Sequence, residues 1–260
     1  MRKISVITVV YNDCVGLEKT IQSVMSQTYN SIEYIVVDGG STDGTVDIIK
    51  KYESFIGKWI SEKDNGIYDA MNKGIQMSTG DWLNFLNASD YFISNTIVED
   101  IAKHLDSSSI VYGNMIRTDG KRRYLTKGAH GNTLDAVDFM HSSISHQAAF
   151  IRKEVFQKYG FYSTNYRLAS DAEFFYRVLV ENKESFKYID KPFVIFALGG
   201  ASSKQQQLYN QERKYFLLKS LSESVYERYE ELYWLRYCKT AVWLAKLKRM
   251  LRNFKHKYLK

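Results

Sequence analysis

The sequence has few of the residues that mark disulfide-stapled, disordered or membrane-spanning proteins. Its two cysteines, Cys14 and Cys238, are too few and too far apart for a disulfide framework or a metal motif, which suits a reducing compartment. A single proline, Pro192, argues against disordered linkers. No apolar run approaches the roughly 18 residues that a membrane-spanning helix needs. The short run Ile4 to Val10 lacks a signal-peptide cleavage site, so a buried first strand explains it better.

The net charge of +7 is concentrated at one end of the chain. From Gln205 onward 13 Lys/Arg stand against 5 Asp/Glu, a balance of +8, whereas residues 1–204 hold 23 against 24, a balance of −1. A diffuse nucleic-acid surface on the main part of the chain is therefore disfavoured. The 260 residues suffice for one large domain, or for one domain with an appendage.

The last stretch of the sequence has the composition of an amphipathic helix at a membrane interface. Its cations, with no acid among them, are Lys239, Lys246, Lys248, Arg249, Arg252, Lys255, Lys257 and Lys260. Apolar residues such as Trp243 and Leu247 are interleaved with them. Each cation near an anionic leaflet adds about 1 kcal/mol of binding. We expect peripheral contact with the inner face of the membrane; the alternative is packing on the main domain or on a partner subunit in a homodimer.

Strand and helix patterns alternate through the first 90 residues. The predicted strands are 3–11, 31–37, 58–60 and 82–86, and the predicted helices are 16–27, 45–52 and 67–77. This alternation predicts an α/β fold with a Rossmann-like, mostly parallel central sheet flanked by helices.

The pattern loosens after Asp90. We predict a helix at 96–105, a hairpin over 110–125, a strand at 146–151, and helices at 153–159 and 171–181. Late strands are predicted at 186–189 and 193–197, followed by a glycine-containing loop and a helical extension to the C-terminus. Residues 128–145 show no clear pattern.

Two carboxylates follow predicted strands, where open α/β sheets bind ligands. Asp38 precedes two glycines and could accept hydrogen bonds from a base or a ribose, or cap its own turn. Asp90 could bind Mg²⁺ or Mn²⁺, or cap the following helix. Because both carboxylates follow predicted strands, we favour ligand binding over capping for the two residues. The loop after Asp38 has neither the dinucleotide fingerprint nor the P-loop lysine.

The segment around Asp171 opens a predicted helix. Ser170 and Glu173 fit a capping box, which would leave Asp171 free to point outward as a general base. His146 precedes an apolar run and is interpreted as a structural residue, because no other histidine has metal-ligand spacing with it.

Taken together, these motifs resemble glycosyltransferase family 2, whose members are inverting, nucleotide-sugar-dependent enzymes with a GT-A fold. The resemblance covers residues 3–203 and is most specific at Val6–Asn12, Val37–Thr45 and Asp64–Gly74. The last of these is similar to bacterial enzymes that build exopolysaccharide, capsule or O-antigen. The family resemblance implies a GT-A domain at 1–203, with a nucleotide-binding half at 1–90 and an acceptor-binding half at 91–203. A basic amphipathic helical tail would follow at 204–260.

The resemblance also implies roles for individual residues. Nucleotide binding, most often of uridine, would fall to Thr8, Tyr11, Asp38 and Gly39. The diphosphate and donor sugar would contact Asp64, Asn72, Lys73 and Asn87. A divalent cation, Mn²⁺ or Mg²⁺, would bind Asp90, and the catalytic base would be Asp171. The loop Gly199–Ser202 would be a late active-site flap.

One position departs from the family pattern. Where close relatives show two adjacent acids, this chain has Ser89 before Asp90.

The expected activity is the transfer of a sugar from a UDP-sugar to a saccharide or a lipid-linked saccharide. This reaction would belong to surface polysaccharide synthesis and would take place on the cytoplasmic side of the membrane. Ser89 motivates an alternative, a non-catalytic nucleotide-sugar-binding or scaffold subunit. A sugar nucleotidyltransferase ranks low, because Tyr11–Cys14 stands where its glycine-rich basic loop belongs.

Overall fold

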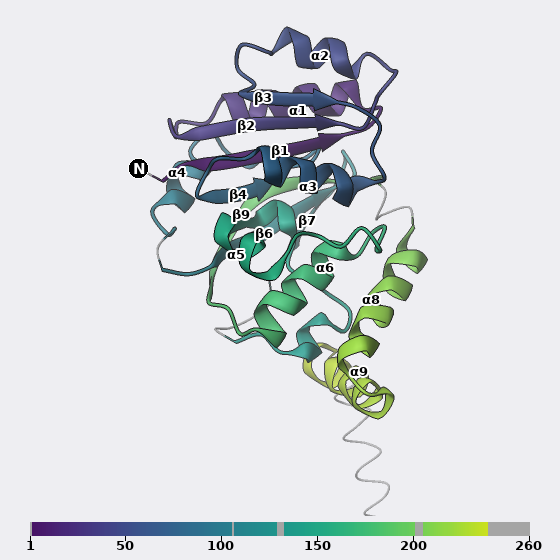
Figure 1. Ribbon diagram of the computed structural model, residues 1–260. Helices are drawn as coiled ribbons and strands as arrows, with labels where there is room; N and C mark the ends of the chain where they lie inside the picture. The colour runs from purple at the N-terminus through teal and green to yellow at the C-terminus, as the bar shows by residue number, and fades with distance from the viewer. Residues whose placement is uncertain (1, 106, 129–132, 201–204, 239–260) are drawn as a thin grey trace, which may run out of the picture.

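The first half of the sheet is parallel, as the alternating pattern predicts. The computed structural model describes residues 2–105, 107–128, 133–200 and 205–238. Within them, four parallel strands lie in the order β3 (Lys58–Ser61), β2 (Ile32–Asp38), β1 (Ile4–Val10) and β4 (Trp82–Phe85). The connecting helices are α1 (Cys14–Met25), α2 (Thr45–Lys51) and α3 (Ile67–Met77) (Figure 1). Every predicted element of this half is confirmed to within a few residues.

Beyond β4 the same sheet becomes mixed, which the parallel prediction did not anticipate. It continues through β8 (Ala149–Arg152), β6 (Ile110–Thr118), β9 (Phe186–Ala197) and β5 (Tyr91–Phe92), with β7 (Arg123–Thr126) paired to β6. The junction between β4 and β8 is antiparallel, whereas β6 and β9 are parallel. The β6–β7 pair confirms the predicted hairpin.

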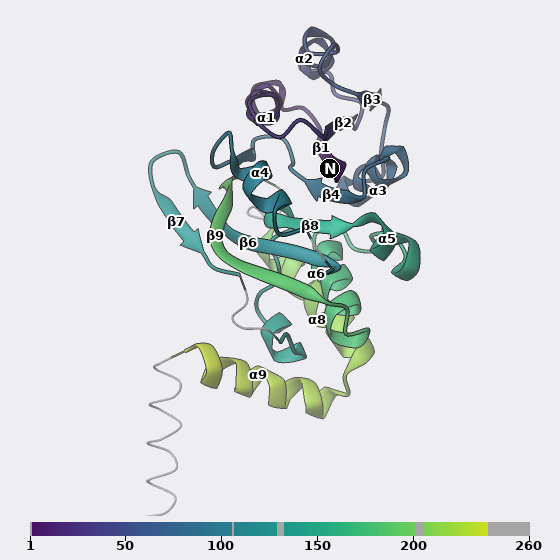
Figure 2. The same cartoon turned by 90° about the vertical axis from the view of Figure 1, so that its left-hand side faces the viewer.

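Apolar side chains cover both faces of the sheet, because both faces carry helices. All seven residues of β1 are buried. Ile7 and Val9 face one core cluster, and Val6 and Val10 face the other. Figure 2 shows α3, α5 (Lys153–Tyr159) and α6 (Ser170–Phe175) on one side and α1 and α4 (Ile97–Ala102) on the other.

Two predicted elements differ in the structure. Residues 186–197 form one continuous strand rather than two. The strand β9 bulges against β6, because Gly113, Asn114 and Met115 pair with Ile189, Pro192 and Val194, and Pro192 has no N–H to donate to the ladder. Residues 146–151 are only half strand: His146–Ala148 forms a 3₁₀ turn, η2, before β8. Asn84 stabilises this turn, since its Nδ2 donates to the carbonyl oxygens of Gln147 and Ala149.

The described part of the predicted tail packs against the domain. Helix α8 (Gln206–Ser220) buries Phe216 and Leu217 in a core cluster, and α9 (Glu223–Tyr237) follows it. At the end of α9, Arg236 forms ion pairs with Asp135 and Asp138. The cations from Lys239 onward lie outside the described residues, and the domain division stays a prediction. Among the described residues, no helix combines the length and the apolar character that a bilayer crossing demands.

We predict that Gly74→Ala destabilises the protein, although alanine favours helices by about 1 kcal/mol. A Cβ added at Gly74 would meet Ile7 Cγ2 at 2.4 Å, between α3 and β1. Overpacking of this kind costs about 1–3 kcal/mol of unfolding free energy. Urea denaturation measures it, with the exposed Gln76→Ala on the same helix as the control. Equal stability of both variants would contradict the close contact.

Candidate active site

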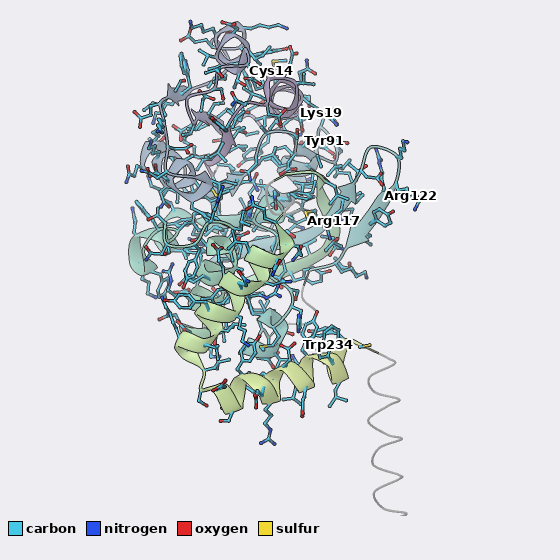
Figure 3. All side chains as sticks on the ribbon, turned by 90° about the vertical axis from the view of Figure 1, so that its right-hand side faces the viewer. Cys14, Lys19, Tyr91, Arg117, Arg122 and Trp234 are labelled. Atoms are coloured by element: carbon cyan, nitrogen blue, oxygen red, sulfur yellow. The ribbon has the colours of Figure 1, made fainter. Side chains whose placement is uncertain are left out.

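The candidate residues gather where the parallel strands end. Asp38 ends β2, Asp64 follows β3, and Asn87 and Asp90 follow β4. Because β1 to β4 are parallel, their carboxyl ends lie at one edge of the sheet. Figure 3 views this edge, where Lys19 lies beside Tyr91, the residue after Asp90, with Lys19 Nζ 3.8 Å from the ring centroid.

The Asp38 carboxylate accepts its hydrogen bonds from neighbouring residues of the protein. It is fully buried and accepts hydrogen bonds from the N–H groups of Gly40 and Ser41 and from the hydroxyls of Ser41 and Ser61. The structure therefore supports the turn-capping alternative for this side chain. These hydrogen bonds fix the shape of the loop.

The exposed surface of this loop is formed by Tyr11, Gly39 and Asp64. Tyr11 is 66% exposed. A Cβ added at Gly39 would lie 2.4 Å from Asp64 Oδ2 and 3.4 Å from the Tyr11 ring, so the Asp64 side chain would have to move to admit a larger residue. Asp64 is oriented by the N–H of Gly66, which donates to its Oδ1 at 2.9 Å. An open ring and a half-buried carboxylate thus stand side by side.

Three residues that we predicted to contact the ligand form hydrogen bonds or ion pairs with other residues of the protein. Thr8 is fully buried, where its hydroxyl donates to the Leu86 carbonyl and lies 3.0 Å from the Tyr34 hydroxyl. The Asn72 amide donates to Tyr162 O and accepts from Tyr162 N, which joins α3 to the loop before α6. Lys73 Nζ pairs with Glu62 at 2.7 Å. Sequence motifs could not separate these structural uses from ligand contacts.

Asp90 is buried beside the end of β9. Its Oδ1 accepts a hydrogen bond from the N–H of Ala197 at 3.1 Å. Burial, which outweighs the hydrogen bonds of Ala197 and Gln147, raises the pKa of Asp90 to about 7. Because the surroundings penalise its negative charge, a neighbouring cation would be favourable there. Among the described residues no three acids, histidines or cysteines come together as a metal site.

Ser89 has a partner of its own. It adopts a left-handed backbone with φ of 74°, and its hydroxyl donates to Asp13 Oδ2 at 2.8 Å. Asp13 also caps α1 by accepting from the N–H of Gly16. An aspartate at position 89 would face the Asp13 carboxylate, so without a cation between them the two negative charges would repel.

Asp171 is held rather than free, which corrects the outward orientation we predicted. Its Oδ1 lies 2.8 Å from the Tyr68 hydroxyl and 2.9 Å from the Ala172 nitrogen, and its Oδ2 lies 2.6 Å from His146 Nδ1. Burial and the charge of Asp171 raise the pKa of Tyr68, which keeps this hydroxyl protonated as a donor.

The predicted capping box at Ser170 is not formed. The N-cap is Ala169, Ser170 Oγ is buried without a hydrogen-bond partner, and Glu173 pairs with Arg177 at 2.8 Å. Instead, Glu212 of α8 accepts from the backbone N–H groups of residues 167–169, which lead into α6. The helix that carries Asp171 is thus anchored by a segment 40 residues downstream, and no local sequence signal indicates this.

His146 is the functional candidate that sequence analysis missed. Its Nδ1 faces Asp171 Oδ2, and its Nε2 lies 3.2 Å from Asn87 Nδ2. One imidazole thus connects the candidate base to the strand-end loop of β4. The only signal in the sequence was its polar character ahead of an apolar run, which is equally typical of a structural histidine.

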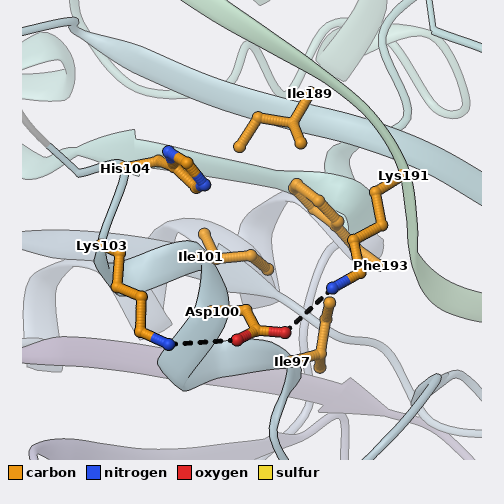
Figure 4. A pocket seen from close by; sticks show the side chains of 8 residues that line it. All are labelled: Ile97, Asp100, Ile101, Lys103, His104, Ile189, Lys191 and Phe193. Carbon is orange, nitrogen blue, oxygen red and sulfur yellow. Dashed lines mark hydrogen bonds and ion pairs between the residues drawn. The ribbon is translucent and has the colours of Figure 1, made fainter.

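A separate cavity of about 230 Å³ lies between α4 and β9 (Figure 4). It is lined by four apolar and four polar or charged side chains, and Asp100 forms ion pairs with Lys103 and Lys191. It contains none of the candidate residues and is smaller than the roughly 300–1,000 Å³ of most ligand pockets. It is not the candidate active site.

Solved structures with the same fold are nucleotide-sugar enzymes. Staphylococcus aureus TarS 1–349 in complex with UDP-GlcNAc matches 92% of this chain, with a TM-score of 0.64 and 17% identity over 74% of that chain. The mannosyltransferase PcManGT from Pyrobaculum calidifontis, in complex with GDP-Man and Mn²⁺, matches 100% of this chain and 81% of its own, with a TM-score of 0.64 and 13% identity. The fold is the GT-A fold of glycosyltransferases.

Sequence comparisons define the family. The model of Glycosyl transferase family 2 matches residues 5–160. Over 179 residues the chain is 36% identical to an uncharacterized glycosyltransferase of Mycobacterium tuberculosis, covering 67% of this chain and 68% of the relative. It is 34% identical over 176 residues to a PGL/p-HBAD biosynthesis glycosyltransferase of Mycobacterium bovis, covering 65% and 67%. The chain belongs to glycosyl transferase family 2 and is a glycosyltransferase, which leaves the scaffold alternative without support.

We predict that Ser89→Asp lowers the unfolding free energy by about 1–3 kcal/mol, the cost of losing a hydrogen bond to a charged group and leaving that group unpaired. Aspartate tolerates the left-handed backbone well, so the loss would come from its charge beside Asp13. Denaturation of Ser89→Asp with and without Asp13→Asn measures it, because asparagine still caps α1. An undiminished loss in the double variant would contradict this origin.

We predict that Asp90→Asn stabilises the metal-free protein at high pH. The pKa of Asp90 is raised from 3.8 to about 7 in the folded state, so its ionisation disfavours folding progressively between these two pH values. The variant should therefore melt at a higher temperature than the wild type at about pH 8, and the difference should shrink toward about pH 4. Thermal melts across this range measure it. A lower melting temperature at pH 8 would contradict the prediction.

Proposed function

We propose that this glycosyltransferase inverts the anomeric configuration of a donor sugar, with Asp171 as the catalytic base. The observation that carries the proposal is the convergence of Asp171, through His146, with Asn87 at the carboxyl ends of the parallel strands. Three hydrogen-bond contacts occupy part of the Asp171 carboxylate. A carboxylate has about four lone-pair sites, so one remains to accept a proton.

The reaction needs one proton transfer and one displacement. Asp171 removes the proton of an acceptor hydroxyl, and the oxygen forms a bond to the anomeric carbon of the donor. The bond from that carbon to the diphosphate oxygen breaks on the opposite face, and a nucleoside diphosphate leaves. A divalent cation, when bound, supplies charge stabilisation for the departing diphosphate. Asp90 is the residue that would hold it.

The donor would lie along the exposed ends of the strands. We propose that Tyr11 and Gly39 contact the nucleoside and that Asp64 and Asn87 contact the diphosphate and sugar. Asp38, Thr8 and Asn72 support these loops from beneath. A uridine nucleotide is the first candidate, in keeping with the UDP-GlcNAc bound by TarS.

The acceptor would be a saccharide or a lipid-linked saccharide in surface glycan synthesis. The name of the Mycobacterium bovis relative, a PGL/p-HBAD biosynthesis glycosyltransferase, supports a glycan-building role. The cations of residues 239–260 would hold the enzyme against an anionic leaflet where such an acceptor resides. Sedimentation with anionic vesicles tests this. A truncated protein ending at Cys238 that is folded and still sediments would refute it.

We predict that Asp171→Asn lowers kcat by about 10²–10⁴-fold, the contribution of a general base, while donor affinity persists. Calorimetric titration with UDP, GDP, UDP-GlcNAc and GDP-mannose, with and without Mn²⁺, identifies the donor. Release of nucleoside diphosphate then measures turnover. Asp119→Asn on the exposed β6–β7 turn is the matched control. Full turnover by Asp171→Asn would refute the assignment.

A further inference from the structure

The His146 ring lies between the candidate base and the candidate donor site. Its Nδ1 is 2.6 Å from Asp171 Oδ2, and its Nε2 is 3.2 Å from Asn87 Nδ2. The side chains of His146 and Asp171 are only 10% and 14% exposed. Because both contacts are shielded from bulk water, neither is a loose surface pair.

The hydrogen-bond partners indicate how the ring is used. Asp171 can only accept when ionised, so Nδ1 must carry a proton and donate it. With the Asn87 amide oriented so that its nitrogen faces the ring, as the structure has it, Nε2 accepts. Both requirements are met by one neutral imidazole protonated at Nδ1, a tautomer assigned from the network.

The backbone that carries the ring is fixed independently of Asp171. His146 begins the turn η2, and Asn84 of β4 donates to the carbonyl of Gln147 in this turn and to that of Ala149, the first residue of β8. Asp171 lies in the first turn of α6, a different element, with its other oxygen near Tyr68 of α3. A ring carried by a backbone that is anchored to the sheet can therefore orient a carboxylate on the neighbouring helix.

We propose that His146 is a positioning residue for Asp171: its Nδ1–H orients the carboxylate so that the remaining lone pair faces the acceptor hydroxyl. Its Nε2 simultaneously orients Asn87 toward the donor. The inference rests on the proposed role of Asp171. It assigns two contacts to His146. The contact with Asp171 affects kcat, and the contact with Asn87 affects the KM for the donor.

Two amide substitutions separate these contacts. In His146→Asn the side-chain nitrogen takes the place of Nδ1 and can still donate to Asp171, but the contact with Asn87 is lost. In His146→Gln the amide oxygen takes the place of Nε2 and can accept from Asn87, but the donor to Asp171 is lost. We expect His146→Gln to lower kcat by about 10- to 100-fold, part of the contribution of the base, with an unchanged KM for the donor. We expect His146→Asn to keep its kcat and to raise the donor KM.

The turnover assay uses the full chain and the nucleotide sugar that binds in calorimetry. His104→Asn and His104→Gln, at the cavity beside α4, are the matched controls, and thermal melts confirm that all variants are folded. Equal kcat values for His146→Asn and His146→Gln, whether normal or reduced, would overturn the inference while leaving Asp171 as the base. Full activity of Asp171→Asn would instead refute the base assignment, and the inference with it.

Nitrogen NMR of the histidine rings gives a readout that needs no substrate. In the wild type we expect the His146 ring to be protonated at Nδ1 and unprotonated at Nε2. The Nδ1 proton signal should shift in Asp171→Asn, because the charged acceptor is gone. A ring protonated only at Nε2 would overturn the proposal.

Discussion

The amide of Asn84 joins the two halves of this protein. From the last parallel strand, β4, its nitrogen donates to the carbonyls of Gln147 and Ala149, which flank the antiparallel junction with β8. The same strand leads directly to Asn87 and Asp90, whereas the turn that Asn84 anchors begins with His146. The strand-end loop and the histidine are therefore linked through β4, which leads into that loop and binds the turn of His146 through the buried Asn84 side chain.

Several polar side chains around the candidate site fix the conformation of its loops. Asp38 and Asn72 form hydrogen bonds with neighbouring backbone and hydroxyl groups. Buried polar groups must be paired, and a loop that approaches a ligand closely has to be held from below. The ligand-facing surface is then left to a few groups, such as Tyr11 and Asp64, placed by these supports. In GT-A enzymes of this family, a motif residue can thus matter through the loop shape it imposes.

The single acid before β5 is consistent with its surroundings. Ser89 donates to Asp13, which caps α1, so one carboxylate serves both a helix end and the loop of Asp90. A second acid would put two negative charges in contact there. Asp90 itself is desolvated, and the cost of its charge would be offset by a cation shared with a diphosphate. The departure from the family pattern is therefore compatible with the activity that the family membership shows.

Local sequence determined the elements of the first 90 residues, because apolar periodicity and glycine turns act over a few residues. It also indicated the family and placed Asp90 and Asp171 at element ends. Only the tertiary structure decided the antiparallel junction at β4, the continuous but bulged β9, and the pairing of His146 with Asp171. These depend on residues 25 to more than 60 positions apart, and a side chain such as Asp38 looks the same in sequence whether it meets a ligand or its own turn. Long-range packing makes that choice, and no local pattern encodes it.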